Sequence, residues 1–188
     1  MKQLFLAAVL AASVTMAQAA EPYFQVGTSW QENRATGADS IAPEVVLGVK
    51  DGNWQYSGKA AFSQTELGNG TLTNSVEGRV RYNFNPVTSF KLKPWTQVRL
   101  GEQIKSNDNF SYYAVDLGVT APVTSVFDLD FTYRYRNAFS SGKDFQADRY
   151  GVEGKLKLTA KDAVGVRYTQ SYGDVDTNAW RLQYARAF

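Results

Sequence analysis

The sequence has no cysteine and no histidine in 188 residues. The missing cysteines exclude disulfides and thiolate metal ligands, and the missing histidines remove the usual general base at neutral pH. No zinc-ligand spacing, phosphate-binding glycine loop or nucleic-acid motif takes their place. We therefore expect no enzyme activity, no catalytic or metal-binding residues, no cofactor and no nucleic-acid partner.

Long apolar runs are also missing, and the one near the N-terminus is short. Lys2 is followed by an apolar stretch from Leu4 to Met16 and then by Ala17-Gln18-Ala19. This order predicts a secretory signal peptide over residues 1–19, cleaved after Ala19, with residues 20–188 forming one domain. The alternative is a membrane-anchor helix, but a run of about 13 residues is shorter than the roughly 20 needed to span a bilayer.

Net charge is small, because 20 Lys and Arg residues balance 18 Asp and Glu residues to a formal charge of +2. Bulk charge therefore indicates no particular partner. Aromatic residues, in contrast, make up 14% of the chain. Their positions, and those of the charges, carry the remaining information.

The last segment shows how the two kinds of residue alternate. Trp180, Leu182, Tyr184 and Phe188 point to one side of a strand, and Arg181 and its i+2 neighbours point to the other. One apolar face and one polar face suit a sheet with lipid on one side and water or polar side chains on the other. A terminal Phe on such a strand resembles the C-terminal signature of Gram-negative outer-membrane β-barrels.

The same alternation recurs in ten segments of about nine to thirteen residues, the length that a tilted strand needs to cross a bilayer. The segments are 22–31, 41–49, 54–65, 73–84, 90–102, 109–121, 126–137, 149–158, 163–172 and 178–188. Short turns follow the even-numbered segments, and longer polar connections follow most of the odd-numbered ones. The pattern predicts an all-β, transmembrane, antiparallel up-and-down barrel of about ten strands, with eight or twelve as alternatives.

Aromatic residues gather at the two ends of the apolar face, where Trp and Tyr favour the lipid headgroup zone. One group is Trp54, Phe84, Phe90, Phe127 and Phe188, and the other is Trp30, Phe62, Tyr135, Tyr150, Tyr172 and Trp180. A soluble periplasmic β-sandwich, the competing class, would hide its apolar face and would not need these girdles. We therefore expect a monomer in the cell outer membrane, in contact with its lipid and lipopolysaccharide.

Two residues depart from the pattern. Pro94 falls inside the fifth segment, where proline cannot donate to the ladder, so we expect a bulge or another irregularity there. Arg186 faces lipid, but it lies near the interface, where a long side chain can reach water.

The inward face of these segments is charged, with fourteen basic and six acidic residues. The basic residues are Lys50, Lys59, Arg79, Arg81, Lys91, Lys93, Arg99, Arg134, Arg136, Arg149, Lys155, Lys157, Arg167 and Arg181. The acidic residues are Glu44, Glu77, Asp116, Asp128, Asp130 and Glu153. We expect ten of the basic residues to face a solute: Lys59, Arg79, Arg81, Lys91, Lys93, Arg99, Arg134, Arg136, Arg167 and Arg181.

The spacing also predicts neighbours across two hairpins. A turn centred on residues 121–125 would place Asp116 beside Asp130, as a pair of carboxylates. The next hairpin would bring Lys155 near Asp130 and Lys157 near Asp128. The nearby lysine favours ordinary ion pairs over a catalytic pair of acids.

Two interpretations of the interior follow. Barrels of about eight strands are filled by side chains, whereas sixteen-stranded porins enclose a channel. Ten strands lie nearer the filled end, but many inward residues are small, including Gly48, Gly101 and Gly118, and small residues leave space. A narrow channel and a salt-bridged, non-conducting barrel with a structural or surface-binding role both remain open.

A more specific resemblance is carried by R-V-R-Y-N-F (79–84), K-L-K-P-W-T-Q-V-R (91–99) and F-T-Y-R-Y-R (131–136). These stretches are similar to those of small monomeric porins of the oligogalacturonate-specific type. The resemblance implies a lumen whose Arg and Lys residues pass acidic oligosaccharides. Together with the charged inward face, it leads us to expect an outer-membrane channel that favours small anions.

Overall fold

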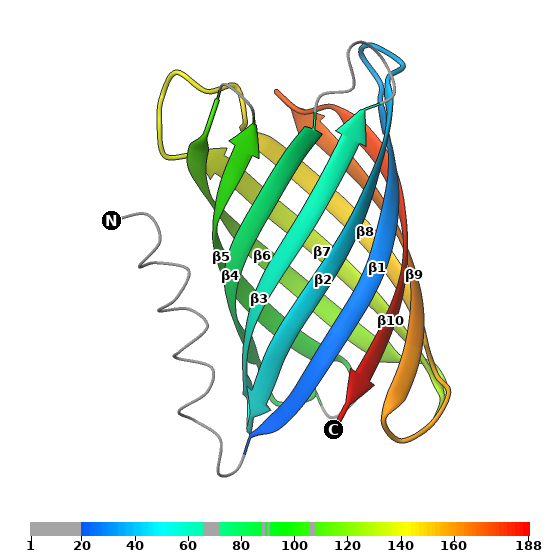
Figure 1. Cartoon of the computed structure of the whole chain (residues 1–188). Helices are drawn as coiled ribbons and strands as arrows, with labels where there is room; N and C mark the ends of the chain where they lie inside the picture. The colour runs from blue at the N-terminus through cyan, green and yellow to red at the C-terminus, as the bar shows by residue number, and fades with distance from the viewer. Residues whose placement is uncertain (1–19, 66–71, 88, 90, 106–107) are drawn as a thin grey trace.

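The computed structural model describes residues 20–65, 72–87, 89, 91–105 and 108–188. It contains ten antiparallel strands (Figure 1): β1 (Glu21–Asn33), β2 (Asp39–Asp51), β3 (Trp54–Thr65), β4 (Leu72–Asn83), β5 (Lys93–Lys105), β6 (Phe110–Pro122), β7 (Phe127–Ala138), β8 (Ala147–Lys157), β9 (Asp162–Gly173) and β10 (Thr177–Ala187). No helix in these ranges is long and apolar enough to cross a membrane. The predicted signal peptide lies outside the described residues, so its cleavage site stays a prediction.

The strands form a closed barrel in which each strand pairs with its neighbours in the chain and β1 pairs with β10. The closing ladder is continuous from Tyr23 opposite Ala187 to Asn33 opposite Thr177. The Phe188 amide extends it by donating to the Pro22 carbonyl over 3.0 Å. Since every strand has two neighbours, no sheet edge is left unpaired, as a bilayer requires. The predicted ten-stranded up-and-down barrel is confirmed.

The apolar face points outward, as the alternation predicted. Large apolar side chains stand exposed along the outside of the wall, including Leu47, Leu117, Val166, Leu182 and Phe131. In a soluble protein these residues would form a core, and here their exposure is matched to lipid. The outward face therefore fixes the barrel as a membrane-spanning one.

Aromatic pairs mark both rims of this apolar band. Near the rim that carries the chain termini, the Tyr82 ring lies 4.8 Å from that of Trp54 and 5.0 Å from that of Phe84. Near the opposite rim, the rings of Tyr168 and Trp180 lie 4.8 Å apart. The two predicted girdles are present at these positions, and Phe90 alone falls outside the described residues.

The connection between β4 and β5 is longer than predicted. Strand β5 begins at Lys93, so Lys91 lies in the connection, with a positive φ of 54° that does not continue a strand. An isolated bridge between Val87 and Leu92 explains why the alternating pattern extends beyond the strand itself. Lys91 is exposed there, and its prediction as a lumen residue is wrong.

Proline acts at a different place from the one expected. Pro94 is the second residue of β5, and the pairing of β5 with β6 continues without interruption from Lys93 opposite Thr120 onwards. The missing N–H of Pro94 therefore produces no bulge in this ladder. The ladder between β2 and β3 instead lacks two pairs at Ala42 and Pro43, where a proline cannot donate.

The small inward residues do not leave empty space, because aromatic rings lie on them. A Cβ atom at Gly48 would stand 2.6 Å from the Tyr23 ring, and one at Gly118 would stand 2.2 Å from the Trp95 ring. Gly101 is covered in the same way by Tyr112. The inference that small residues open the interior is therefore wrong at these three positions, where glycine instead provides a seat for a ring.

Leu158 and Val166 test the orientation and depth of the wall. Both point outward and are about half exposed, Val166 in the middle of β9 and Leu158 just beyond the end of β8. Val166→Arg should lower the free energy of unfolding by about 2–4 kcal/mol, and Leu158→Arg by about 0–1 kcal/mol. Denaturant titration in lipid vesicles measures both. Equal effects would contradict the depth assignment.

A substitution at Gly118 tests whether inward glycines make room for the aromatic rings that pack on them. Gly118→Ala would place a methyl group against the Trp95 ring and 2.8 Å from the Phe131 carbonyl, so we expect a loss of about 1–3 kcal/mol. Gly58→Ala is the matched control, since the nearest atom to its Cβ would be 4.0 Å away. The same titration applies, and a neutral Gly118→Ala would show that the ring is not seated there.

Candidate lumen ion network

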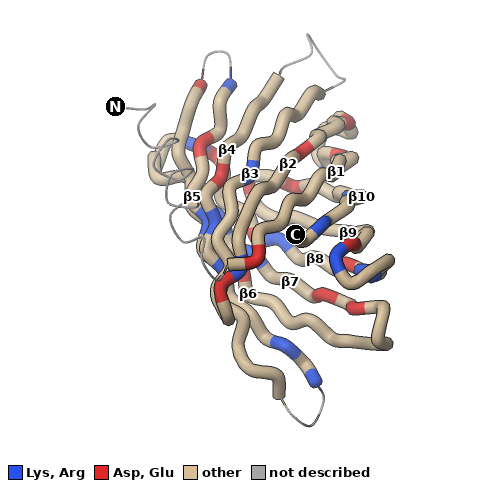
Figure 2. Tube along the Cα trace, turned by 60° about the horizontal axis from the view of Figure 1, so that its bottom comes forward, with Lys and Arg blue, Asp and Glu red and all other residues tan. Residues whose placement is uncertain are grey.

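The inward face brings arginines into direct opposition. Arg79 lies opposite Arg99, Arg134 opposite Arg149, and Arg167 opposite Arg181. Like charges directly opposite on neighbouring strands are destabilising, with Cβ atoms only about 5 Å apart. Nearby carboxylates relieve this repulsion. Figure 2 shows basic and acidic positions interspersed along the barrel trace.

Glu77 on β4 supplies one such carboxylate. It accepts from Arg79 at 2.7 Å and from Arg99 at 3.1 Å, so it bridges two opposed arginines. The Tyr112 hydroxyl, reaching from β6, donates to it over 2.8 Å, and Lys59 lies 4.0 Å away. Four donors from four strands thus converge on a carboxylate that is only 6% exposed.

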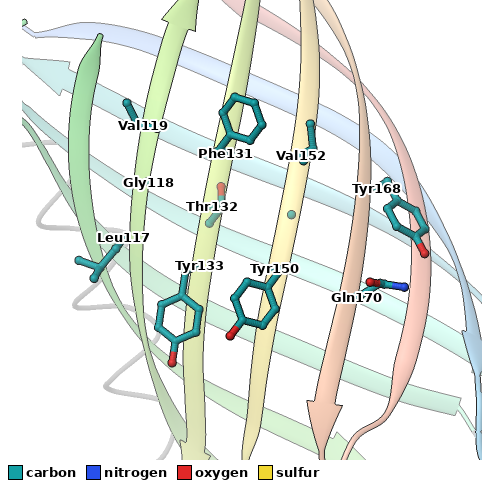
Figure 3. Close-up of a pocket in the computed structure, with 11 residues that line it drawn as sticks. Leu117, Gly118, Val119, Phe131, Thr132, Tyr133, Tyr150, Val152, Tyr168 and Gln170 are labelled. Atoms are coloured by element: carbon teal, nitrogen blue, oxygen red, sulfur yellow. The ribbon is translucent and has the colours of Figure 1, made fainter.

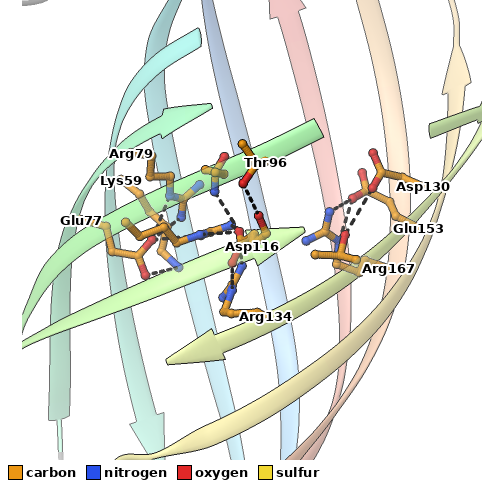
Figure 4. Close-up of polar contacts among 12 residues, drawn as sticks. Lys59, Glu77, Arg79, Thr96, Asp116, Asp130, Arg134, Glu153 and Arg167 are labelled. Atoms are coloured by element: carbon orange, nitrogen blue, oxygen red, sulfur yellow. Dashed lines mark hydrogen bonds and ion pairs between the residues drawn. The ribbon is translucent and has the colours of Figure 1, made fainter. Parts of the chain in front are cut away.

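Asp116 on β6 continues the network around the wall. Its carboxylate lies 2.6 Å from guanidinium nitrogens of both Arg99 and Arg134, and Gln97 donates to it over 2.9 Å. Figure 4 shows Arg134 beside Asp116. Arg99 therefore joins Glu77 to Asp116, and the chain of ion pairs extends from β3 to β7.

A second cluster lies on the other side of the barrel. Glu153 on β8 accepts from Arg167 and Gln183, and Lys155 lies 3.7 Å away. Lys155 also reaches Asp130 on β7, at 3.0 Å. In Figure 4 this cluster stands apart from the one around Asp116.

Glu44 on β2 lies between the two clusters. It contacts Lys59 at 3.2 Å on one side and Arg181 at 2.6 Å on the other. Lys59 also approaches Glu77, and Arg181 lies opposite Arg167. The charged residues therefore form a belt around the inside of the wall, which we call the ion belt. Its members are Glu44, Lys59, Glu77, Arg79, Arg99, Asp116, Arg134, Asp130, Glu153, Lys155, Arg167 and Arg181.

The predicted hairpin neighbours have mixed outcomes. Lys155 contacts Asp130, and Lys157 lies 2.9 Å from Asp128, so both expected ion pairs are confirmed. Asp116 lies opposite Arg134, and Asp130 lies opposite Thr120, so the expected pairing of Asp116 with Asp130 is wrong. The register across the β6–β7 turn differs by four residues from the predicted one. Because four is even, the side chains keep their faces but change partners.

Within the ion belt, each basic side chain is more exposed than the carboxylate it contacts. The exposed fraction is 28% for Lys155 against 0% for Asp130, and 12% for Arg134 against 0% for Asp116. The same order holds for Arg167 over Glu153. The difference is largest for Lys155, Arg134 and Arg167 and only one percentage point for Arg79 over Glu77.

Five inward cations contact no carboxylate in the part of the chain that the structure describes: Lys50, Arg81, Lys93, Arg136 and Arg149. Three of them cover aromatic rings, with Arg81 3.9 Å from the Trp95 centroid, Arg136 4.2 Å from that of Phe145, and Lys50 5.7 Å from that of Tyr23. These cations lie toward the two ends of the barrel, outside the ion belt.

Sequence reasoning missed the neutral partners of the network. Tyr112 and Gln97 donate hydrogen bonds to carboxylates of the ion belt. The rings of Trp95 and Tyr23 pack against glycines on one side and contact the cations Arg81 and Lys50. Their positions share the inward parity of Arg99, Asp116 and Gly27, so the alternation contained the signal. It was missed because only the charged and small residues of the inward face were considered.

A hollow of about 630 Å³ lies on the other side of the wall (Figure 3). Outward side chains of β6 to β9 line it, including Leu117, Phe131, Tyr133, Tyr150 and Val152. It therefore belongs to the lipid-facing surface and has no access to the ion belt.

Arg99 tests the dependence of the fold on the ion belt. Arg99→Gln should lower the free energy of unfolding by about 3–5 kcal/mol, because it leaves two buried carboxylates short of a partner. Arg81→Gln, the matched control, removes an inward arginine without a carboxylate partner and should cost markedly less. Denaturant titration in lipid vesicles compares them. Equal losses would show that the pairing itself contributes nothing.

Comparisons with known proteins agree on the fold. No protein-family model matches the chain, and no curated protein matches it. Among solved structures, the β-domain of the Bordetella autotransporter BrkA has a TM-score of 0.53 at 11% identity, covering 91% of this chain and 100% of that one. The NanC porin has a TM-score of 0.51 at 10% identity, covering 87% and 98%. The KdgM porin, in complex with disordered oligogalacturonate, reaches 0.46 at 12% identity, covering 90% and 99%.

These similarities concern the barrel and not its solute. They combine with three features of this chain: a wall without free edges, a band of exposed apolar side chains and an aromatic girdle at each rim. The protein is a closed, membrane-spanning β-barrel with the fold of outer-membrane barrel proteins.

Proposed function

We propose that the protein is a narrow outer-membrane channel that favours small anionic solutes. The observation that carries the proposal is the difference in exposure within the ion belt, where cations face the lumen and carboxylates lie against the wall. The ion belt also has seven cations for five carboxylates, so its charge is positive. Such a surface raises the local concentration of anions and lowers that of cations.

Because the cations of the ion belt are already paired with carboxylates, they are suited to weak, transient contacts with a passing anion. A cation already in contact with a carboxylate offers an arriving anion only part of its hydrogen-bonding capacity, so each contact is weak. Arg99, Arg134 and Arg167 are each paired in this way, and an anion can leave such weak sites without being trapped. The arrangement supports transport through several weak sites over storage in one tight site.

The channel is narrow because rings and ion pairs occupy much of the interior. Tyr23, Trp95 and Tyr112 lie over inward glycines, and Tyr112 also reaches across β5 to Glu77. Ten strands give a barrel that side chains nearly fill. The proposal is therefore limited to small solutes, such as organic acids or the units of acidic oligosaccharides, carried by a monomer in contact with outer-membrane lipid and lipopolysaccharide.

A non-conducting barrel is the second candidate, and the burial of the belt carboxylates favours it. Asp116 and Asp130 are 0% exposed and Glu153 is 1% exposed, so water reaches these groups poorly. In this alternative the ion belt is a structural filling. The two candidates differ in a single property, conduction.

Single-channel recording in planar bilayers tests the proposal. Under a KCl gradient we expect discrete conductance steps and a reversal potential that shows chloride preference. Replacing Lys50, Arg81 and Lys93 together by Gln should reduce the preference without unfolding the barrel, because none of the three has a carboxylate partner among the described residues.

Arg186→Gln is the control, since Arg186 is a cation on the lipid side of the wall, 3.6 Å from Asp162. It should leave the reversal potential unchanged. A wild-type protein that does not conduct would favour the filled barrel, and a cation preference would refute the anionic channel directly.

A further inference from the structure

At the end of the barrel opposite Phe188, the inward cations Arg136 and Arg149 lack the carboxylate contacts that the ion belt provides among the described residues. Arg149 lies directly opposite Arg134, and Arg136 is its diagonal neighbour on β7, at a Cβ separation of roughly 7–8 Å. Arg134 forms an ion pair with Asp116, so Asp116 compensates Arg134 and not Arg149. In the part of the chain that the structure describes, no carboxylate contacts Arg136 or Arg149. Among the described residues, positive charge is therefore concentrated here without a contacting carboxylate.

The donors at this place are left without acceptors. The Nε of Arg136 is buried and has no hydrogen-bond partner in the structure. Arg149 donates its Nε to the Ser171 hydroxyl over 2.7 Å, which leaves the other guanidinium donors of the fork. Leaving a buried charged donor unsatisfied costs more than making a hydrogen bond gains. This end of the lumen therefore favours the arrival of an acceptor.

A hydroxyl on the next strand adds to the same wall. Thr177 lies directly opposite Ser171 across β9 and β10, and it is only 1% exposed. Its Oγ1 is buried and has no hydrogen-bond partner. Arg149, Ser171 and Thr177 thus occupy successive strands on the inward face, with a free hydroxyl at the end of the row.

Phe145 gives the place one apolar side. The β7–β8 connection carries its ring inward, where it lies 4.9 Å from the Phe110 ring and 5.1 Å from the Tyr112 ring. The Arg136 guanidinium stacks on the same ring, which covers its flat face. Its Nε is buried, so its terminal nitrogens, which make no hydrogen bond among the described residues, are the donors left for a solute. An apolar cover strengthens a charge-assisted hydrogen bond made by those nitrogens.

We propose that Arg136 and Arg149, with the Thr177 hydroxyl, form a carboxylate-binding site that loads the lumen from this end. This inference rests on the proposed channel for its role, but not for its existence. Two guanidinium forks match the planar, bidentate geometry of a carboxylate, and a hydroxyl donor serves a remaining lone pair. A small organic acid with more than one carboxylate can contact both arginines at once.

Equilibrium binding of citrate to the detergent-solubilised barrel tests the site without requiring conduction. Isothermal titration calorimetry at low ionic strength should show binding to the wild type. Arg136→Gln and Arg149→Gln should each weaken it by about tenfold or more. Both variants should retain the barrel, shown by different migration of heated and unheated protein in SDS gels, because neither residue supports a carboxylate.

Lys93→Gln is the matched control, because it removes one inward charge at the opposite end of the barrel. It should leave citrate affinity within about twofold of the wild type, whereas an equal loss would show that only the general field attracts citrate. Arg149→Lys keeps the charge but not the fork, and it should bind citrate several-fold more weakly than the wild type. A wild type without measurable citrate binding, or an Arg149→Gln variant with unchanged affinity, would overturn the site.

The two proposals fail in different ways. Citrate binding that depends on Arg149 in a barrel that does not conduct would keep the site and remove the channel. Chloride-selective conduction with no dependence of citrate affinity on Arg136 or Arg149 would keep the channel and remove the site.

Discussion

The repulsion between arginines that lie opposite one another inside the closed wall is the constraint on which the interior depends. Three pairs of arginines face each other across neighbouring strands, and such contacts oppose folding unless anions separate them. Glu77 bridges Arg79 and Arg99, whereas Asp116, Glu153 and Glu44 each contact one member of another pair. Arg149, opposite Arg134, contacts no carboxylate among the described residues. Each carboxylate ties together cations from different strands, so the ion belt links strands that are not neighbours in the ladder.

This constraint determines what the lumen presents. A carboxylate that must reach two arginines lies beneath them, at the wall, and the longer basic side chains extend above it. The belt has seven cations for five carboxylates, and each cation is more exposed than the carboxylate it contacts. A balanced count of charges, such as that of the whole chain, therefore says little about the field inside the barrel. The depth of each charge matters as much as its sign.

Much of the fold could be predicted from the sequence, because a barrel wall repeats one simple rule. Period-two alternation identified all ten strands, their facing and the closing partner strand, and the terminal Trp180 to Phe188 pattern was sufficient for the last one. Errors arose where the rule does not decide. Lys91 continues the alternation but sits at a positive φ in a connection, and Pro94 lies at a strand start where its missing donor is harmless.

The site could be predicted only in part, because alternation fixes a face but not a partner. Asp116 was assigned to the correct face and to the wrong neighbour, since a register difference of an even number of residues leaves every face unchanged. The contribution of Tyr23, Trp95 and Tyr112 was hidden for another reason. Each of these three rings lies against a glycine on a neighbouring strand, and that pairing depends on the register.

The positions of the uncompensated cations follow from the same packing. In the middle of the barrel an unpaired guanidinium would be enclosed by the belt, and the cost of burying it would exceed any gain from a passing solute. Toward the ends, an aromatic face or a hydroxyl can support the cation while its remaining donors stay available, as with Arg81 on Trp95 and Arg149 on Ser171. Carboxylates therefore stabilise the cations at mid-height, and neutral groups such as Trp95 and Ser171 contact the cations toward the ends. A solute anion would meet its strongest donors where it enters and leaves, and weaker, shared donors in between.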